Sequence, residues 1–388
     1  MMKYKKLYFF NLVLLSTLIF NACRKDLEPV KEDTEIVPQE PRDTVPDSSI
    51  ELKGFYLLNE GNMNMNKASL DYFDFNSGLY SRNIYGQANP EVVKGLGDVG
   101  NDMAIYGSKL YVVVNISNKV EVLDVKTGKK IKQIDVINCR YITFHKGSAY
   151  VSAYLGEVGD PKAPNGVVVR IDTTTLNEVQ RVSVGRQPEE MAIVGEKLYV
   201  ANSGGYSPPN YERTVSVINL NTFQVVKNID VAVNLHRLKA DQYGDLYVTS
   251  RGDYYDIPSK LFVIDTKTET IKKKFDIGVS NLVIDEDHAY YYNTEFSYIT
   301  GENVINYGVL NIKDEVLTDQ KFITDGTEGS IMIPYGIAVN PITKDLYVTD
   351  AKDYVSPGTL YCFDKITGKK KWSVQTGDIP NKLVFVYE

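Results

Sequence analysis

A tyrosine near the middle of a short apolar strand recurs seven times along the chain. The period is about 40 to 55 residues, and each unit has room for four short strands, which is typical of the blades of a β-propeller. Because aromatic side chains favour strands and fill the space between wedge-shaped blades, we expect these tyrosines to be structural. The sequence therefore predicts an all-β fold, a seven-bladed β-propeller. The repeated residues are Tyr56, Tyr111, Tyr150, Tyr199, Tyr247, Tyr290 and Tyr347.

The two ends of the repeat region complement each other. The first unit begins at Gly54 directly with its tyrosine strand, whereas residues 381–387 have the pattern of an inner strand with nothing after it. Pairing of this C-terminal strand into the first blade would remove two open sheet edges and close the ring. A six-bladed alternative treats residues 281–324 as an insertion, but the strand-like segments 290–292 and 309–311 favour a seventh blade.

The first 50 residues differ from the repeats. Three lysines precede an apolar run at residues 7–20, and a small residue stands just before Cys23, as in a bacterial lipoprotein signal. We expect residues 1–22 to be a signal peptide and Cys23 to be lipidated, which would anchor the protein to a membrane without spanning it. The alternative is an ordinary secretory signal followed by an unrelated cysteine.

Residues 23–50 are predicted to be a disordered tether, because they are rich in proline and acidic residues and poor in aromatic ones. The propeller then occupies residues 51–388. The formal net charge of −7 argues against nucleic acid as a partner, since phosphate binding requires a basic surface. Cys139 and Cys362 fall in distant repeats, so we expect both to be unpaired.

One face of the predicted ring carries the long loops. In a four-stranded blade, the connection that enters the inner strand and the one that leaves the second strand lie on the same face. The opposite face has short turns here, whereas the first face has long irregular loops, which on a rigid scaffold are common sites of function. These loops span residues 59–69, 154–166, 202–214, 251–260, 293–307 and 350–359.

The long loops combine aromatic residues with asparagine, arginine and histidine. Aromatic rings give a large contact area, and Asn or Arg supplies hydrogen bonds in fixed directions, so this face suits a bulky amphipathic ligand or another protein. The alternative is that the loop tyrosines only pack on one another. The candidate ligand-binding residues are Asn59, Asn115, Arg140, Tyr154, Arg186, Asn202, Tyr206, His236, Arg237, Arg251, Tyr254, Asn293, Tyr298, Tyr335 and Tyr354.

Signals for catalysis are weak. The three histidines do not have the spacing of a metal site, and no acid and base are paired along the chain. We therefore expect a protein that is not an enzyme and that uses neither a metal nor a cofactor. The alternative is a calcium-dependent propeller hydrolase or lyase that uses rim acids such as Glu190.

Several segments resemble those of one family. They are residues 59–62 (NEGN), 67–74 (KASLDYFD), 334–341 (PYGIAVNP) and 346–354 (LYVTDAKDY). Over the whole repeat region the chain resembles the YncE-like propeller lipoproteins of Bacteroidetes, which include the BtuG proteins. This resemblance implies a seven-bladed fold and a lipid-anchored protein of the outer membrane that is exposed at the cell surface.

The same resemblance implies a function. BtuG proteins capture cobalamin and pass it to the outer-membrane transporter BtuB, so the implied ligand is cobalamin or another corrinoid and the implied partner is a TonB-dependent transporter. No corrinoid-specific motif carries over residue by residue, and the candidate residues rest on the strand pattern. The alternative is a protein-interaction propeller that docks a transporter or a surface polymer through the same loops.

Overall fold

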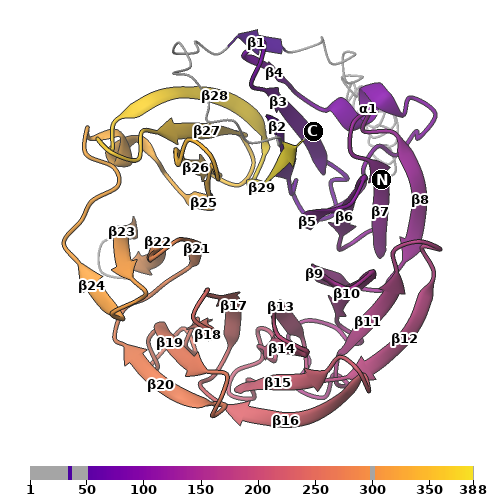
Figure 1. The fold of residues 1–388 in the computed structure, drawn as a ribbon, viewed down its shortest axis with the longest axis vertical. Coiled ribbons are helices and arrows are strands. Elements are labelled where there is room, and N and C mark those ends of the chain that lie inside the picture. The colour runs from indigo at the N-terminus through magenta and orange to yellow at the C-terminus, as the bar shows by residue number, and fades with distance from the viewer. Residues whose placement is uncertain (1–33, 37–50, 298–301, 388) are drawn as a thin grey trace, which may run out of the picture. The chain divides into compact units, whose positions relative to one another are not determined.

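Seven antiparallel sheets form a ring in which one edge strand of each sheet faces the central axis (Figure 1). The computed structural model describes residues 34–36, 51–297 and 302–387, all within a unit that begins at Thr34. The predicted signal peptide, the lipidation site Cys23, most of the tether and Tyr298 lie outside the described residues. The all-β, seven-bladed architecture predicted from the repeats is confirmed.

The first four blades follow the chain from the N-terminal side, and their strands are given from the centre of the ring outwards. Blade 1 contains β29 (Pro380–Tyr387), β2 (Leu52–Asn59), β3 (Ser69–Asp74), β4 (Leu79–Ser81) and β1 (Thr34–Ile36). Blade 2 contains β5 (Gly100–Tyr106), β6 (Lys109–Val114), β7 (Lys119–Asp124) and β8 (Lys130–Asp135). Blade 3 contains β9 (Cys139–His145), β10 (Ser148–Ala153), β11 (Val167–Asp172) and β12 (Glu178–Ser183). Blade 4 contains β13 (Pro188–Val194), β14 (Lys197–Asn202), β15 (Thr214–Asn219) and β16 (Gln224–Asp230).

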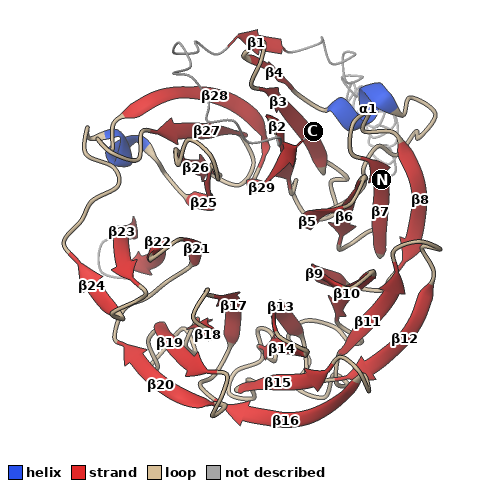
Figure 2. Cartoon of the chain, in the orientation of Figure 1, coloured by secondary structure: helices blue, strands red, loops and turns tan. Residues whose placement is uncertain are grey.

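The remaining three blades complete the ring. Blade 5 contains β17 (Leu235–Ala240), β18 (Asp245–Ser250), β19 (Lys260–Asp265) and β20 (Thr270–Phe275). Blade 6 contains β21 (Asn281–Asp285), β22 (His288–Ser297), β23 (Glu302–Asn311) and β24 (Val316–Thr318). Blade 7 contains β25 (Pro334–Val339), β26 (Leu346–Asp350), β27 (Pro357–Phe363) and β28 (Lys370–Asp378). Figure 2 shows the two short helical segments on the outside of the ring, α1 (Ile84–Ala88) and the 3₁₀ helix η1 (Thr327–Ser330).

The C-terminal strand closes the ring, as the sequence predicted. Strand β29 pairs antiparallel with β2, which places Phe385 opposite Phe55 and Leu383 opposite Leu57. Strand β2 follows the tether and has no inner strand of its own in the sequence, so β29 supplies the missing edge. The last and first parts of the chain therefore share one sheet, and β2 is paired along both of its edges.

Each blade packs on the next through a separate apolar cluster. Every one of the seven repeated tyrosines lies in a different cluster, on the side of its blade that faces the following blade. All seven are at most 3% exposed. Some also bond across the interface, since the Tyr56 hydroxyl donates to the Val125 carbonyl at 2.8 Å. Their structural role is confirmed.

The cluster between blades 7 and 1 is the richest in aromatic rings. Phe55 contacts Phe73, Tyr347 and Phe385 with ring centroids 5.2, 5.4 and 6.1 Å apart. Trp372 packs against Phe73 in the same cluster. Closure therefore rests on side-chain packing as well as on backbone pairing.

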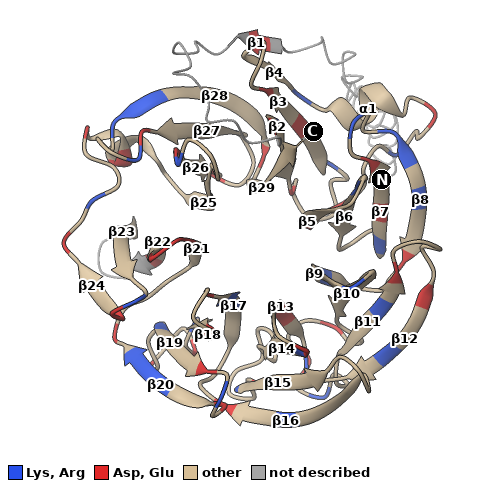
Figure 3. Ribbon diagram, in the orientation of Figure 1, with Lys and Arg blue, Asp and Glu red and all other residues tan. Residues whose placement is uncertain are grey.

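The face opposite the long loops is built from tight turns. In six blades an Asp or Asn is the last residue of the third strand, and in blade 7 Asp364 directly follows that strand. The side chain accepts hydrogen bonds from backbone N–H groups two or three residues later, as Asp124 does from Lys126 and Thr127. The Thr127 hydroxyl also donates to Asp124, and this bond together with the backbone bonds lowers the pKa of Asp124 below its usual value. Such turns fix the hairpin between the third and outer strands at short length. Figure 3 shows acidic and basic residues interspersed along the outer strands.

Part of the predicted tether is paired to blade 1. Strand β1 lies antiparallel to β4, with Glu35 opposite Tyr80. This differs from the expectation of a disordered segment throughout 23–50, because three residues of it add a fifth strand to the outer edge of blade 1. An outer edge strand offers free backbone groups to any extended segment nearby, and composition alone does not reveal such pairing.

We expect closure of the ring to be sensitive to packing of the final strand. Leu383 is 7% exposed and lies in the cluster that joins blades 7 and 1. Leu383→Ala should lower the free energy of unfolding by about 2 to 3 kcal/mol, because it removes buried methyl groups and leaves a cavity. Val226→Ala on β16, where the side chain is 56% exposed, is the matched control and should change stability by less than about 0.5 kcal/mol. Equal effects of the two changes in urea denaturation would contradict a packed closing strand.

Candidate functional site

A large cavity opens among the long loops at the centre of one face. Its volume is about 1130 Å³, and residues from all seven blades line it. They come from the starts of the inner strands and from the loops that leave the second strands, as predicted from the strand order. This volume is slightly above the usual range for small-molecule sites, so the cavity has room for a bulky ligand.

Ten of the predicted site residues line this cavity. They are drawn from blades 2, 3, 4, 5 and 7, which the sequence alone could not place relative to one another. These residues are Asn115, Arg140, Tyr154, Tyr206, His236, Arg237, Arg251, Tyr254, Tyr335 and Tyr354.

Three predicted asparagines lie inside the blades and do not line the cavity. Asn59 and Asn202 are fully buried, and Asn293 is 6% exposed. Asn202 donates to Ser216 at 2.9 Å and accepts from the Gly185 backbone N–H at 3.1 Å, so it ties the end of its strand to the junction before the inner strand. A Cβ on Gly185 would lie 2.5 Å from Asn202, which shows how closely the two segments approach. Asn202 is structural because its amide serves a donor and an acceptor at once, and Asn59 donates to Ser69 and Asp71 within blade 1.

Arg186 also lies outside the cavity. Its Nε donates to Glu212 at 3.1 Å and its Nη1 donates to the Pro161 carbonyl at 3.0 Å. The side chain therefore joins the loop after β10 to the loop after β14. A charged residue in a long loop could equally have faced a ligand, and only the fold shows that it serves the loops instead.

β-Bulges near the starts of six inner strands place many of the site residues. In β9, Arg140 and Tyr141 together oppose the single residue Ser152, and in β17, His236 and Arg237 oppose Thr249. The opposing hydroxyl accepts a bond from the bulged backbone, since the Tyr141 N–H donates to Ser152 at 3.1 Å. The bulges lie at residues 101, 140–141, 189–190, 236–237, 335–336 and 381. A bulge re-aims side chains at a strand end, so neighbouring residues can both reach the cavity.

Sequence reasoning did not select several of the residues that line the cavity. Glu60, Asn101, Tyr141, Glu189 and Tyr292 all do so. Strict alternation along a strand points successive side chains at the two neighbouring blades, and the bulges break that rule. In blades 3, 5 and 7 a Ser or Thr of the second strand opposes the bulge, and this combination of polar inner-strand residues with a hydroxyl residue was the available signal.

Glu189 is the centre of a buried ionic network. Its Oε2 accepts from Arg140 at 3.1 Å, and its Oε1 accepts from the Tyr154 hydroxyl at 2.6 Å and lies 3.5 Å from Arg251. Burial alone would raise the pKa of the Glu189 carboxyl, but the guanidinium groups of Arg140 and Arg251 outweigh burial and hold that pKa below its usual value. One carboxylate thus fixes two arginines and a tyrosine at the cavity wall.

Tyr141 connects the two arginine-bearing strands β9 and β17. Its hydroxyl accepts from Arg237 at 3.2 Å and lies 3.0 Å from Nε2 of His236. Burial, followed by the positive charges of Arg251, Arg237 and Arg140, lowers the pKa of His236 well below its usual value. The imidazole is therefore neutral, and its tautomer sets which of the two groups, Nε2 or the Tyr141 hydroxyl, donates the hydrogen bond between them.

Glu60 lies at the opposite part of the cavity wall. It accepts hydrogen bonds from the Tyr335 hydroxyl at 2.9 Å and from Asn381 at 2.7 Å. Burial raises the pKa of the Glu60 carboxyl to about 7, and the bond from Tyr335 and the charges of Arg140 and Arg237 only partly offset burial. This carboxyl is therefore partly protonated near neutral pH.

The rim of the cavity is aromatic. The rings of Tyr206 and Tyr254 stack with centroids 5.5 Å apart and an interplanar angle of 14°. Both are only partly covered, with 59% and 42% of their surface exposed. Tyr335 and Tyr354, from blade 7, meet edge to face at 6.0 Å. The loop tyrosines thus pack on one another, as the alternative held, and also present ring faces and edges to the cavity.

Glu190, the acid named for the alternative of a hydrolase or lyase, forms a hydrogen bond and an ion pair with blade 5. It accepts from the Leu238 backbone N–H at 3.0 Å and pairs with Lys239.

Within the described ranges, no group of three or more His, Cys, Asp or Glu side chains is placed to hold a metal ion. The cysteines Cys139 and Cys362 are both buried and free. In the part of the chain that the structure describes, no helix has the length and apolar character needed to cross a membrane.

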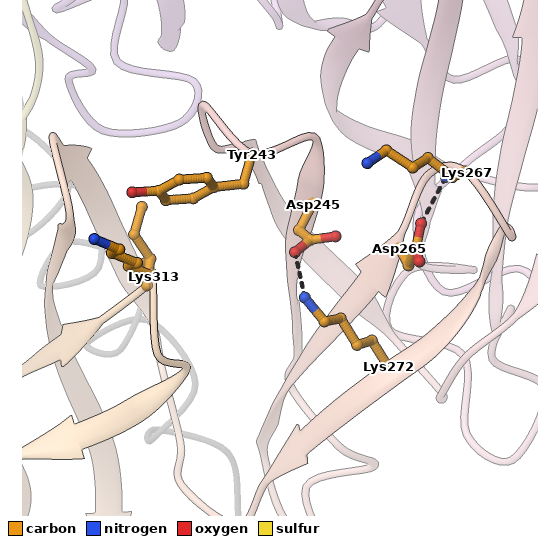
Figure 4. Close-up of a pocket in the computed structure, with 7 residues that line it drawn as sticks. Tyr243, Asp245, Asp265, Lys267, Lys272 and Lys313 are labelled. Carbon is orange, nitrogen blue, oxygen red and sulfur yellow. Dashed lines mark hydrogen bonds and ion pairs between the residues drawn. The ribbon is translucent and has the colours of Figure 1, made fainter.

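A smaller cavity of about 340 Å³ lies on the opposite face, between blades 5 and 6. Figure 4 shows Tyr243, Asp245 and Lys272 around it, with Lys272 bonded to Asp245. That bond measures 2.8 Å, and Lys272 also pairs with Glu315. The ammonium group of Lys272 is thus paired with two carboxylates of the protein itself, whereas Arg237 in the large cavity has no such ion pair.

Comparison with known proteins gives a family and a fold. The family model described as "Domain of unknown function (DUF5074)" matches residues 53–385. No curated protein matches the chain in sequence. A hypothetical selenium-binding protein from Sulfolobus tokodaii is similar in structure, with a TM-score of 0.60, 11% identity and coverage of 87% of this chain and 94% of that one.

Two further solved structures are similar in the same way. A functionally unknown protein from Desulfotomaculum acetoxidans has a TM-score of 0.60 at 11% identity, over 86% of this chain and 98% of that one. A "Quinonprotein alcohol dehydrogenase-like protein" from Bacteroides thetaiotaomicron has a TM-score of 0.58 at 16% identity, over 86% of this chain and 78% of that one. At these identities the likeness concerns the fold alone.

We expect Glu189 to be the charge on which the arginine network depends. Glu189→Gln should lower the free energy of unfolding by about 3 kcal/mol, because it leaves two buried guanidinium groups without a carboxylate. Glu196→Gln is the matched control, since Glu196 pairs with Lys146 on the surface and its side chain is 42% exposed. The control should leave stability nearly unchanged. If urea denaturation gave equal losses for both variants, the network would not carry the stability assigned to it.

The raised pKa of Glu60 predicts a pH-dependent stability. The folded protein keeps the Glu60 proton up to about pH 7, whereas the unfolded chain releases it near the ordinary value of 4.5. The wild type should therefore lose up to about 2.5 kcal/mol from this group as the pH rises from 5 to 8. Glu60→Gln does not titrate, so its stability relative to the wild type should increase by that amount between pH 5 and pH 8. An equal difference at both pH values in urea denaturation would show that Glu60 titrates normally.

Proposed function

The chain belongs to the DUF5074 family, and we propose that its propeller is a non-enzymatic binding protein that captures a bulky amphipathic small molecule in the central cavity. The observation that carries this proposal is the lining of the cavity. Partly exposed aromatic rings stand at the rim, and arginines held by fixed partners stand at the wall. This is the combination that binds a ligand with both apolar and polar surfaces.

The rigidity of the ring supports tight capture. The inner-strand residues are held by bonds between blades, as where Asn381 of β29 donates to the Asn101 carbonyl of β5 at 2.7 Å. Side chains that are already ordered lose little conformational entropy when a ligand binds. The cavity therefore offers its polar groups without rearrangement of the blades.

We propose a corrinoid, and cobalamin in particular, as the ligand to test first. The resemblance to the YncE-like lipoproteins and BtuG suggests it, and the chemistry is compatible. A corrinoid presents a broad ring edged with amides and a nucleotide tail. Arginine and asparagine can bond to amides, and tyrosine rings such as Tyr254 can lie against the macrocycle. In this proposal Cys23 is lipidated, the protein is anchored at the surface of the outer membrane, and the ligand passes to a TonB-dependent transporter.

A second function, docking of another protein or a surface polymer, is favoured by the exposed rim. Exposed apolar side chains line the mouth of the cavity: Met63 is 62% exposed, Val158 54% and Tyr255 79%. Apolar residues gathered around one opening are a common feature of interaction surfaces. The same rim could dock the transporter that receives the ligand, so the two functions are compatible.

Cyanocobalamin binding tests the proposal directly. The full chain, purified in detergent, should release or absorb heat when titrated with cyanocobalamin in a calorimeter, with saturation at one site. Tyr254→Ala should weaken binding about tenfold, because a stacking surface at the cavity is lost. Tyr243→Ala is the matched control, since Tyr243 has the same 42% exposure and lies at the opposite face. The absence of heat and of co-elution at micromolar protein would count against a corrinoid ligand.

A further inference from the structure

Three arginines stand on the wall of the large cavity, together with the carboxyl groups of Glu60, Glu189, Asp256 and Glu295. Arg140, Arg237 and Arg251 line it, and Arg140 and Arg251 share the one carboxylate of Glu189. The Glu60 carboxyl is partly neutral near pH 7, because burial raises its pKa to about 7.

Among the arginines that line the cavity, Arg237 differs because it forms no ion pair with a carboxylate of the described residues. Its Nη1 donates to the Tyr141 hydroxyl at 3.2 Å, and its Nε is buried without a hydrogen-bond acceptor. Among the described residues, no carboxylate lies within ion-pair distance of Arg237. The nearest acids are engaged elsewhere, since Glu190 pairs with Lys239 and Glu60 accepts from Tyr335.

The other cations of the inner strands differ from Arg237 in this respect. Lys239 pairs with Glu190, and Lys382 lies 3.2 Å from Asp102. A partly buried guanidinium without a counter-charge costs free energy, which an anion bound beside it would recover. The planar guanidinium also suits the two oxygens of a carboxylate or phosphate better than an ammonium would.

We infer that the ligand of this cavity carries an acidic oxyanion, a carboxylate or a phosphate, and that Arg237 receives it. This inference rests on the proposed binding function and adds the chemical class of the ligand. The stacked rings of Tyr206 and Tyr254 line the same cavity, so the oxyanion belongs to a molecule that also has a flat ring system.

The two possible oxyanions can be tested with matched fluorescent compounds. Flavin mononucleotide and riboflavin share a flat ring and differ by a phosphate, and pyrene-1-butanoate and pyrene-1-butanol differ by a carboxylate. In the full chain, the acid of at least one pair should bind about tenfold or more tightly than its neutral partner, as expected for bonds to a charged group. Equal binding within both pairs would overturn the inference.

Variants assign the preference to Arg237. Arg237→Gln should reduce the ratio of acid to neutral affinity to about one, and Arg237→Lys should retain part of it. Arg170→Gln is the matched control, because Arg170 bonds to Ser148 on β10 at 3.0 Å and does not line the cavity. Thermal unfolding of each variant shows whether the fold is kept. A preference unchanged in a folded Arg237→Gln protein would contradict the role of this residue.

The outcomes also separate this inference from the proposed function. If cyanocobalamin binds and none of the four compounds does, the inference fails while ligand capture stands. If the acids bind with the expected preference and cyanocobalamin does not, the oxyanion site stands and the corrinoid is the wrong ligand. If no compound binds, both fail.

Discussion

The pairing of β29 with β2 is the contact on which the rest of the structure depends. The blades pack side by side, so the ring is complete only when blade 7 meets a finished blade 1. Strand β29 supplies the inner edge of blade 1 and part of the apolar cluster between blades 7 and 1. With the last contact made, the inner strands of all blades hold fixed positions around one axis, and the cavity can draw its lining from every blade.

Within that ring, the bulges determine the chemistry of the cavity. An ordinary inner strand would point successive residues at the two neighbouring blades in turn. At β9, β17 and β25 two residues oppose one on the neighbouring strand, and in β9 Arg140 and Tyr141 both reach the cavity. The extra backbone N–H groups need an acceptor, and the hydroxyls of Ser152, Thr249 and Thr349 provide it. The bulges are therefore built into the second strands as well as into the inner ones.

Charges in the cavity are matched across blades rather than within them. Arg140 of blade 3 pairs with Glu189 of blade 4, and Glu189 also meets Arg251 of blade 5. Asp102 of blade 2 pairs with Lys382 of β29 and accepts from the Ile142 backbone N–H of blade 3. Since each pair spans an interface, the electrostatic pattern exists only in the closed ring. It also leaves Arg237 as the cation for which a ligand can supply the counter-charge.

Much of the site could be located from the sequence, but not its composition. Loop length predicted the face on which the large cavity opens, and ten of the chosen residues line that cavity. The chosen asparagines that end second strands include Asn202, which lies inside its blade because its side chain accepts from the backbone N–H of Gly185. The choice of residues missed Tyr141 and Glu189 because strand alternation does not reveal a bulge. A polar residue in a loop can form hydrogen bonds either with a ligand or with another part of the protein, and the sequence does not show which.

The sequence by itself determined the all-β class, the seven repeats and the closing strand, since these follow from local periodicity and from the unpaired ends of the pattern. Only the tertiary structure decided which polar groups face the centre and which remain unmatched there. The physical reason is that hydrophobic repeats are encoded strand by strand, whereas a cavity wall is assembled from residues of separate blades. Their distances, charges and shared protons depend on the closed ring.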